Sequence, residues 1–247
     1  LAFSLLYVAM GVPIGRWIDS GRRIGVMTAC IAVWSICTAL CGAAGSFFSM
    51  FLARVGVGAG EAGLNPGAVS LIGDYFPADQ VARPIGIFSM GIYIGGGIAL
   101  ILGGQMAAYF ASLGEIRLPF LGDVSGWRAV FVAVGMPGLL IAILFRSTVR
   151  EPLRLSNAGA VAPDLRAAAA YARRNGRLLG LLLGAFVAFG FNIYALLGWY
   201  PAMFVRSFGA DAGTIALTYG PIYLAAGTLG ALVLGSATQW LRARGFS

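Results

Sequence analysis

The stretch that decides the fold runs from residue 47 to residue 73 and reads FFSMFLARVGVGAGEAGLNPGAVSLIG. It is long enough to cross a bilayer as one helix, because about 20 apolar residues span the hydrocarbon layer. Arg54 and Glu61 are its only charged residues. A charge inside a bilayer costs at least ~2.5 to 3.5 kcal/mol on insertion scales. Such residues therefore usually face the protein interior and serve a function.

The two charges share one face of the predicted helix. Seven residues make about two helical turns, so Arg54, Gly58, Glu61 and Asn65 form a polar stripe. A carboxylate near mid-membrane with a cation two turns away is what proton-coupled or anion-handling transport requires. The alternative is a fixed ion pair between Arg54 and Glu61 that locks helix packing, and the sequence leaves open whether the two are in contact.

Composition places the chain in the membrane. Apolar residues make up 59% of it and charged residues 11%, and a soluble domain could not bury so much apolar surface. The net charge of +8 comes from arginines clustered in a few loops, as membrane topology requires, so nucleic-acid binding is not expected. Cys30, Cys37 and Cys41 lie in one apolar segment and the chain has no histidine. We therefore expect no metal, no cofactor and no enzyme active site.

Hydropathy predicts an all-α polytopic membrane protein. Seven hydrophobic segments cover about residues 1–15, 25–45, 47–73, 84–110, 127–146, 177–203 and 214–241. The arginine-rich loops alternate with arginine-poor ones, so the positive-inside rule assigns one set to the cytoplasm. The first segment is too short to cross a bilayer and begins without Met, so we expect a fragment that starts inside a helix and lacks helix one.

An internal repeat predicts two halves. Residues 15–19 (GRWID) are followed by Arg22 and Arg23, and residues 235–239 (GSATQ) by Arg242 and Arg244, six helices later. Parallel repeats of this kind are common in secondary transporters. We expect an N-terminal half at 1–146 (helices two to six), a cytoplasmic inter-half loop at 147–176, and the start of a C-terminal half at 177–247 (helices seven and eight).

Further candidate residues lie outside the central stretch. Asn192 and Tyr194 are polar groups inside an apolar helix and are expected to face a substrate cavity. Asp19 with Arg22 and Arg23 is interpreted either as a positive-inside anchor or as a charge latch that stabilises one access state. Crowded glycines in the third and fourth segments allow close helix packing, which is either static or permits sliding. Prolines within the spans predict kinks: Pro66, Pro137, Pro201 and Pro221.

These motifs resemble the major facilitator superfamily. Gly15 and Asp19 with the arginine pair look like its loop motif between helices two and three, and residues 235–239 look like the second-half copy. Arg54 matches the helix-four arginine, and GWRAVF at 126–131 a common start of helix six. The resemblance implies a fold of about twelve helices, of which about seven are present.

Within that superfamily the chain is most similar to Spinster-type lipid transporters. The likeness is carried by RVGVGAGEA at 54–62, Asn65-Pro66, Ser70, DYFP at 74–77 and REPLR at 150–154. The resemblance implies that Arg54 and Glu61 take part in substrate binding and proton coupling. It also implies export of lysolipids, phosphorylated sphingoid bases or other amphiphiles.

The sequence thus predicts a proton-coupled secondary transporter for an amphipathic, anionic solute, working by alternating access. Arg54 would hold the head group or tune Glu61, Glu61 would carry the proton, and Gly15, Asp19, Arg22 and Arg23 would govern gating. An organic-anion or drug carrier of the same superfamily is the alternative, and a non-transporting receptor or scaffold is an alternative of another class. Expected partners are substrate, protons and the bilayer, for a monomer in a bacterial inner membrane. We do not expect the seven-helix piece to transport by itself.

Overall fold

The protein is a bundle of long helices. The computed structural model describes residues 2–19, 23–77, 80–112, 114–118, 122–152 and 165–245. The elements are α1 (Ala2–Asp19), α2 (Arg23–Ala43), α3 (Phe47–Glu61), α4 (Leu64–Tyr75), α5 (Ala82–Ser112), β1 (Glu115–Leu118), β2 (Gly122–Ser125), α6 (Gly126–Thr148), α7 (Leu165–Arg174), α8 (Gly176–Phe208) and α9 (Ala212–Ala243). The predicted helical membrane architecture is confirmed.

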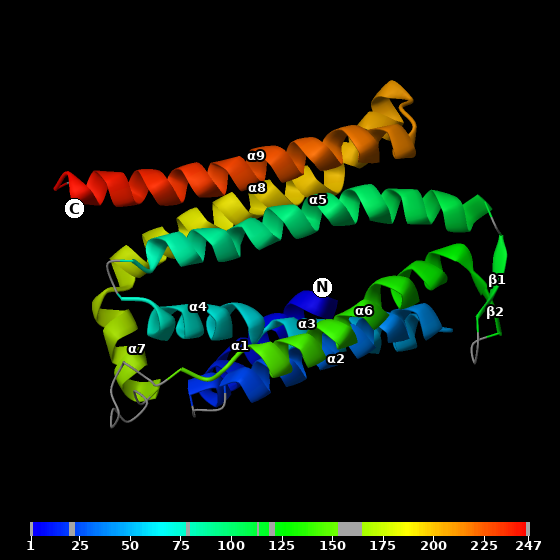
Figure 1. Ribbon diagram of the computed structural model, residues 1–247. Coiled ribbons are helices and arrows are strands. Elements are labelled where there is room, and N and C mark those ends of the chain that lie inside the picture. Colours follow the sequence, from blue (N-terminus) through cyan, green and yellow to red (C-terminus); the bar gives the residue numbers. More distant parts are fainter. Residues whose placement is uncertain are drawn as a thin grey trace.

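The long helices lie side by side in two layers, with α5, α8 and α9 in one and α1, α2, α3 and α6 in the other (Figure 1). Within the described residues, five helices are long and apolar enough to cross a membrane: α2, most of α5, α6, α8 and much of α9. The ends expected in the cytoplasm gather at one end of the bundle. This end holds the start of α2, the ends of α4 and α6, and the starts of α5 and α8 (Figure 1).

The stretch 47–73, expected as one helix, is divided into α3 and α4 at Ala62 and Gly63, although both of these residues keep right-handed helical dihedral angles. Pro66 is the physical reason. Proline has no backbone N–H, and its ring clashes with the carbonyl group four residues earlier, which here belongs to Ala62. The predicted effect of this proline is therefore seen as an interruption directly after Glu61.

Two short elements were not predicted. The connection between α5 and α6 contains an antiparallel hairpin in which Glu115 pairs with Ser125 and Leu118 with Gly122. The predicted inter-half loop contains the helix α7. Neither has the long apolar run by which the spanning segments were recognised.

Glycines set the distance between helices in the first layer, where α2 packs against both α3 and α6. A Cβ atom at Gly60 would lie 2.6 Å from the backbone nitrogen of Trp34 and 2.8 Å from the carbonyl oxygen of Cys30. At Gly135 it would lie 2.8 Å from the carbonyl oxygen of Ser35. Only glycine permits such approaches. Close approach of the backbones increases the van der Waals contact that holds helices together in lipid.

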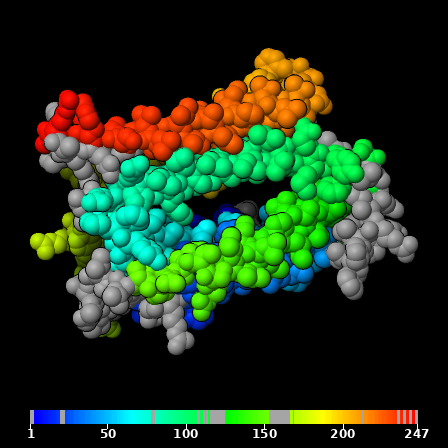
Figure 2. All heavy atoms as spheres, viewed as in Figure 1, coloured from blue at the N-terminus to red at the C-terminus, as the bar shows by residue number. Residues whose placement is uncertain are grey.

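The second layer is built on the contact between α5 and α9, which pack along much of their length. A Cβ atom at Gly97 would lie 3.0 Å from the carbonyl oxygen of Gly220, and one at Gly220 would lie 3.3 Å from that of Gly97. The two backbones therefore meet at a reciprocal glycine contact. Between the layers, the space-filling view shows a hollow separating α5 from α6 (Figure 2).

The close contact of α2 with α3 predicts a large effect for a small substitution. Gly60→Ala should lower the unfolding temperature, because overpacking costs about 1–3 kcal/mol. Gly73→Ala is the matched control, since a Cβ atom there meets nothing within 4 Å. Thermal unfolding followed with a thiol-reactive dye measures both, because Cys30 and Cys41 are free and buried. Equal unfolding temperatures for the two variants would contradict the packing described.

Candidate functional site

Glu61 is the last residue of α3, placed directly before the interruption caused by Pro66. Its side chain is half-buried. Asn65 follows one turn later, is exposed, and forms no hydrogen bond with a described residue through its side chain. The carboxyl group thus stands at the junction of α3 and α4, in the central part of the predicted span.

Arg54 lies two turns earlier on α3 and is exposed. Its guanidinium carbon lies 5.0 Å from the centre of the Phe131 ring of α6, which is a cation–π distance. Among the described residues, no ion pair joins Arg54 to Glu61. The ring supports the arginine without neutralising it, so the guanidinium remains available to an anion.

One tyrosine, Tyr7 of α1, is an electrostatic neighbour of Glu61, and it leads on to tyrosines of α8 and α9. The phenol of Tyr7 in α1 is within electrostatic reach of Glu61 and of Tyr194 in α8. Tyr194 is in turn within electrostatic reach of Tyr223 in α9. The site therefore takes groups from both predicted halves of the chain, and the predicted residues Glu61 and Tyr194 are linked through Tyr7.

A row of aromatic rings continues from this point between α5, α9 and α8. The ring centres of Tyr93 and Tyr223 are 5.8 Å apart, and those of Tyr219 and Tyr223 are 6.4 Å apart. Tyr219 then stacks on Tyr200 at 6.3 Å with an angle of 14°. The row lies where α5 and α9 meet and ends on α8.

Sequence reasoning missed Tyr7 and Tyr223. A signal was present in the second case, since Tyr219 and Tyr223 are one turn apart in an apolar helix and so share a face. Asn192, which was predicted with Tyr194, lies two residues away and points about 160° from it around the helix. Asn192 is exposed, and its side chain forms no hydrogen bond with the described residues.

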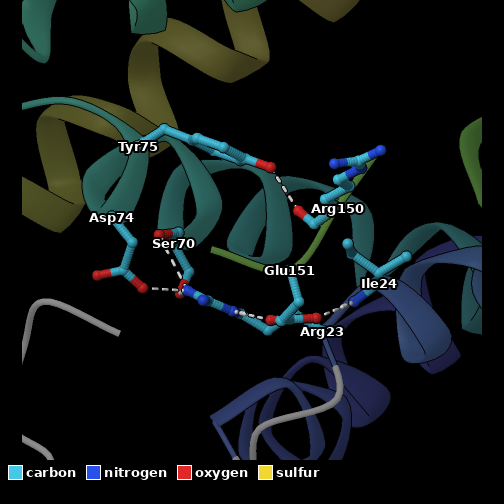
Figure 3. A network of polar contacts seen from close by, with 7 residues as sticks. All are labelled: Arg23, Ile24, Ser70, Asp74, Tyr75, Arg150 and Glu151. Carbon is cyan, nitrogen blue, oxygen red and sulfur yellow. Dashed lines mark hydrogen bonds and ion pairs between the residues drawn. The ribbon is translucent and has the colours of Figure 1, made fainter. Parts of the chain in front are cut away.

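A second polar site lies at the cytoplasmic end, around Arg23 at the start of α2 (Figure 3). The side chain is only 1% exposed and forms ion pairs with Asp74 of α4 and, at 2.7 Å, with Glu151 after α6. It also donates to the hydroxyl group of Ser70 at 3.2 Å. We call Arg23, Asp74 and Glu151 the charge network.

Neighbouring backbone groups extend the charge network. The second carboxylate oxygen of Glu151 accepts a hydrogen bond of 3.1 Å from the backbone N–H of Ile24, so it also caps α2. The hydroxyl group of Tyr75 donates to the carbonyl oxygen of Arg150 (Figure 3). These contacts tie together the start of α2, the end of α4 and the segment after α6.

The predicted gating residues separate in the structure. Arg23 joins the charge network, whereas Asp19 is the exposed last residue of α1 and pairs with none of the described cations. A Cβ atom at Gly15 would meet nothing within 4 Å. Arg22 lies outside the described residues. The acids that pair with Arg23 are Asp74 and Glu151, which sequence reasoning noted only as parts of motifs.

Comparison with known proteins settles the family. The family model of the Major Facilitator Superfamily matches residues 1–246. The chain belongs to the Major Facilitator Superfamily. This is a family of membrane transporters and not of enzymes, so the prediction that the chain is not an enzyme is confirmed, as is its place as an integral membrane protein.

Individual relatives agree with that assignment. An MFS-type efflux pump of Mycolicibacterium smegmatis is 28% identical over 98% of this chain and 53% of its own length. A probable L-galactonate transporter of Escherichia coli is 30% identical over 97% of this chain and 52% of its own length. The chain therefore spans about half the length of these relatives.

The predicted likeness to Spinster carriers is also confirmed. A crystal structure of a bacterial homolog of the human lysosomal transporter Spinster, inward-facing and unoccupied, matches with a TM-score of 0.72 and 35% identity. The match covers 98% of this chain and 54% of that one.

The charge network predicts a graded loss of stability. Asp74→Asn should lower the free energy of unfolding most, by about 3–5 kcal/mol, because it leaves a buried guanidinium short of a partner. Glu151→Gln should cost less, since the Glu151 side chain is 35% exposed and that of Asp74 only 10%. Asp19→Asn is the control and should change stability by no more than about 0.5 kcal/mol. Thermal unfolding of the three variants checks this order, and an Asp74→Asn variant as stable as Asp19→Asn would refute it.

Proposed function

We propose that a full-length carrier containing this chain is a proton-linked transporter that moves an amphipathic anion across the membrane by alternating access. The observation that carries the proposal is that no ion pair joins Arg54 to Glu61 among the described residues, although the two groups lie within electrostatic reach of each other. The arginine rests on the Phe131 ring at 5.0 Å, and the carboxyl group stands at the end of α3. A cation without a fixed counterion is suited to bind an anion, and a carboxyl group without a fixed cation is suited to bind a proton.

The surrounding groups fit a solute with an apolar part. Tyrosine offers a large apolar surface and one polar tip, and Tyr93, Tyr200, Tyr219 and Tyr223 form a continuous row of rings beside the site. The head group would lie at Arg54 and the tail along the rings. This arrangement and the likeness to Spinster carriers favour a lipid-like solute.

Alternating access would use the two predicted halves, residues 1–146 and 177–247, joined by the loop at 147–176. The contact of α5 with α9 joins the two, with the reciprocal approach of Gly97 and Gly220 at its centre. Side chains of each helix lie against glycines of the other, as Leu224 does against Gly97 and Ile101 against Gly220. The smooth glycine surfaces would let one helix rock on the other. The charge network would act as the cytoplasmic latch, holding α2, α4 and the end of α6 as one rigid body.

A small organic anion is the second candidate solute. The relative from Escherichia coli is named as a probable L-galactonate transporter, and galactonate is an organic anion without an apolar tail. Arg54 and Glu61 would serve such a solute in the same way, whereas the row of tyrosines would not be needed. A competition panel of lysolipids against sugar acids separates the two.

Glu61→Gln tests the proton step. In proteoliposomes with a full-length carrier, a pH gradient should drive uptake of a labelled lysophospholipid by the wild type, and the variant should lose gradient-driven uptake. Exchange of labelled for unlabelled solute without a gradient should persist, because a glutamine imitates the protonated carboxyl group. Glu61→Asp is the control that keeps a titratable group. Gradient-driven uptake by Glu61→Gln at the wild-type rate would rule out the proton role.

Arg54→Gln tests the anion step. The variant should raise KM for an anionic solute about tenfold or more, since a charge-assisted hydrogen bond contributes about 1.5–3 kcal/mol. Transport of a neutral amphiphile with the same tail should be unchanged. Arg206→Gln, which removes an exposed charge at the other end of the bundle, is the matched control. An equal change in KM for charged and neutral solutes would mean that Arg54 does not bind the head group.

A further inference from the structure

The helix α7 stands apart from the transport site and has an unusual composition. Its sequence, LRAAAAYARR, contains three arginines and no acidic residue. Tyr171, Arg173 and Arg174 are all exposed. Arg173 and Arg174, which occupy the last turn, form no ion pair or hydrogen bond with a described residue through their side chains. Arg173 and Arg174 therefore present positive charge that no described residue neutralises.

The position of α7 places this charge near the membrane surface. The helix lies between the end of α6 and the start of α8 and runs crosswise to the spanning helices (Figure 1). It continues almost directly into α8, since only Asn175 separates the two. A helix so close to the start of a spanning segment, and across its direction, is placed to lie along the plane of the bilayer at the cytoplasmic boundary.

Among the described residues, the acids at this end of the bundle are Asp19, Asp74 and Glu151. Asp74 and Glu151, which lie at the same end of the bundle, are both engaged by Arg23. Arg83, Arg146 and Arg177 also lie at this end and have no ion-pair partner among the described residues. Basic side chains therefore outnumber acidic ones among the described residues at this end.

The two sides of α7 differ. Ala170 lies between the directions of Arg173 and Arg174 around the helix, and Ala172 lies on the opposite side. A helix with a basic side and small apolar residues opposite can lie in the interface, with its arginines extended to the phosphates. Tyr171, 64% exposed, is of the type enriched at that depth.

We propose that α7 binds the anionic headgroups of the cytoplasmic leaflet and thereby anchors the loop between the two halves to the membrane. The binding is electrostatic in the main, because alanines bury little apolar area. It depends on the fraction of anionic lipid and weakens as salt rises. Lipid charge would thus control how tightly the loop is held while the halves move.

The test uses a full-length carrier in which Cys30, Cys37 and Cys41 are replaced by alanine. An environment-sensitive fluorophore is attached at Ala172→Cys, or at Ala170→Cys as the control on the basic side. The protein is placed in nanodiscs of phosphatidylcholine alone or of phosphatidylcholine with phosphatidylglycerol. Quenching by a lipid that carries a shallow spin label reports contact with the membrane.

We expect quenching at Ala172→Cys in the discs with phosphatidylglycerol, weaker quenching at Ala170→Cys, and loss of both in high salt. Removing Arg173 and Arg174 together, as Gln, should lower the ratio of membrane-bound to free label by more than about tenfold. Arg206→Gln should leave it unchanged.

Equal quenching in both lipid compositions would overturn the proposal, since the arginines would then only satisfy the positive-inside rule. An absence of quenching in both compositions would overturn it too, and would indicate that the helix faces an acidic protein or the solvent. If quenching in the discs with phosphatidylglycerol stayed the same when both arginines were replaced, the charge of Arg173 and Arg174 would not be its cause.

Discussion

The cost of placing a charge in a low-dielectric environment governs this structure, and the chain meets it in two different ways. Arg23 is almost completely buried and is matched by two carboxylates and a hydroxyl group. Arg54 and Glu61, further into the membrane, are matched by an aromatic ring and by tyrosines. The first arrangement holds its charge with fixed ion-pair partners, although one guanidinium nitrogen of Arg23 has no hydrogen-bond partner among the described residues. The second leaves its charges open to outside ligands.

This difference indicates a structural role for the charge network and a functional role for Arg54 and Glu61. A buried ion pair with good geometry holds its helices in one arrangement and loses several kcal/mol when one partner is removed. The charge network therefore makes the ends of α2, α4 and α6 one unit. Charges without fixed partners are costly to keep, and their retention in a span is best explained by a ligand or a proton that occupies them during the transport cycle. Glu61 lies next to the junction of α3 and α4, where Pro66 cannot donate a backbone hydrogen bond to the carbonyl group of Ala62.

The membrane spans and the residues that share one helix face could be predicted from the sequence, whereas the contacts between distant helices could not. The stretch at 47–73 indicates a span, its length and the shared face of Arg54 and Glu61. The partners of Arg23 are 51 and 128 residues away in the sequence. The periodicity of a helix shows which of its residues share a face, but not which other helix that face will contact. Tyr7 and Tyr223 were missed for the same reason. The irregularity at Pro66 was predicted as a kink, but the sequence did not show that the stretch would be divided into α3 and α4 at Ala62 and Gly63.

The central claim is that Glu61 exchanges a proton as solute binds. It is tested most directly by adding solute to the purified full-length carrier in weakly buffered solution and measuring the change in pH. The account predicts that binding moves protons between the wild-type protein and the solution, and that Glu61→Gln abolishes this change while still binding solute. Proton exchange of the same size in the variant, or none in the wild type, would contradict it.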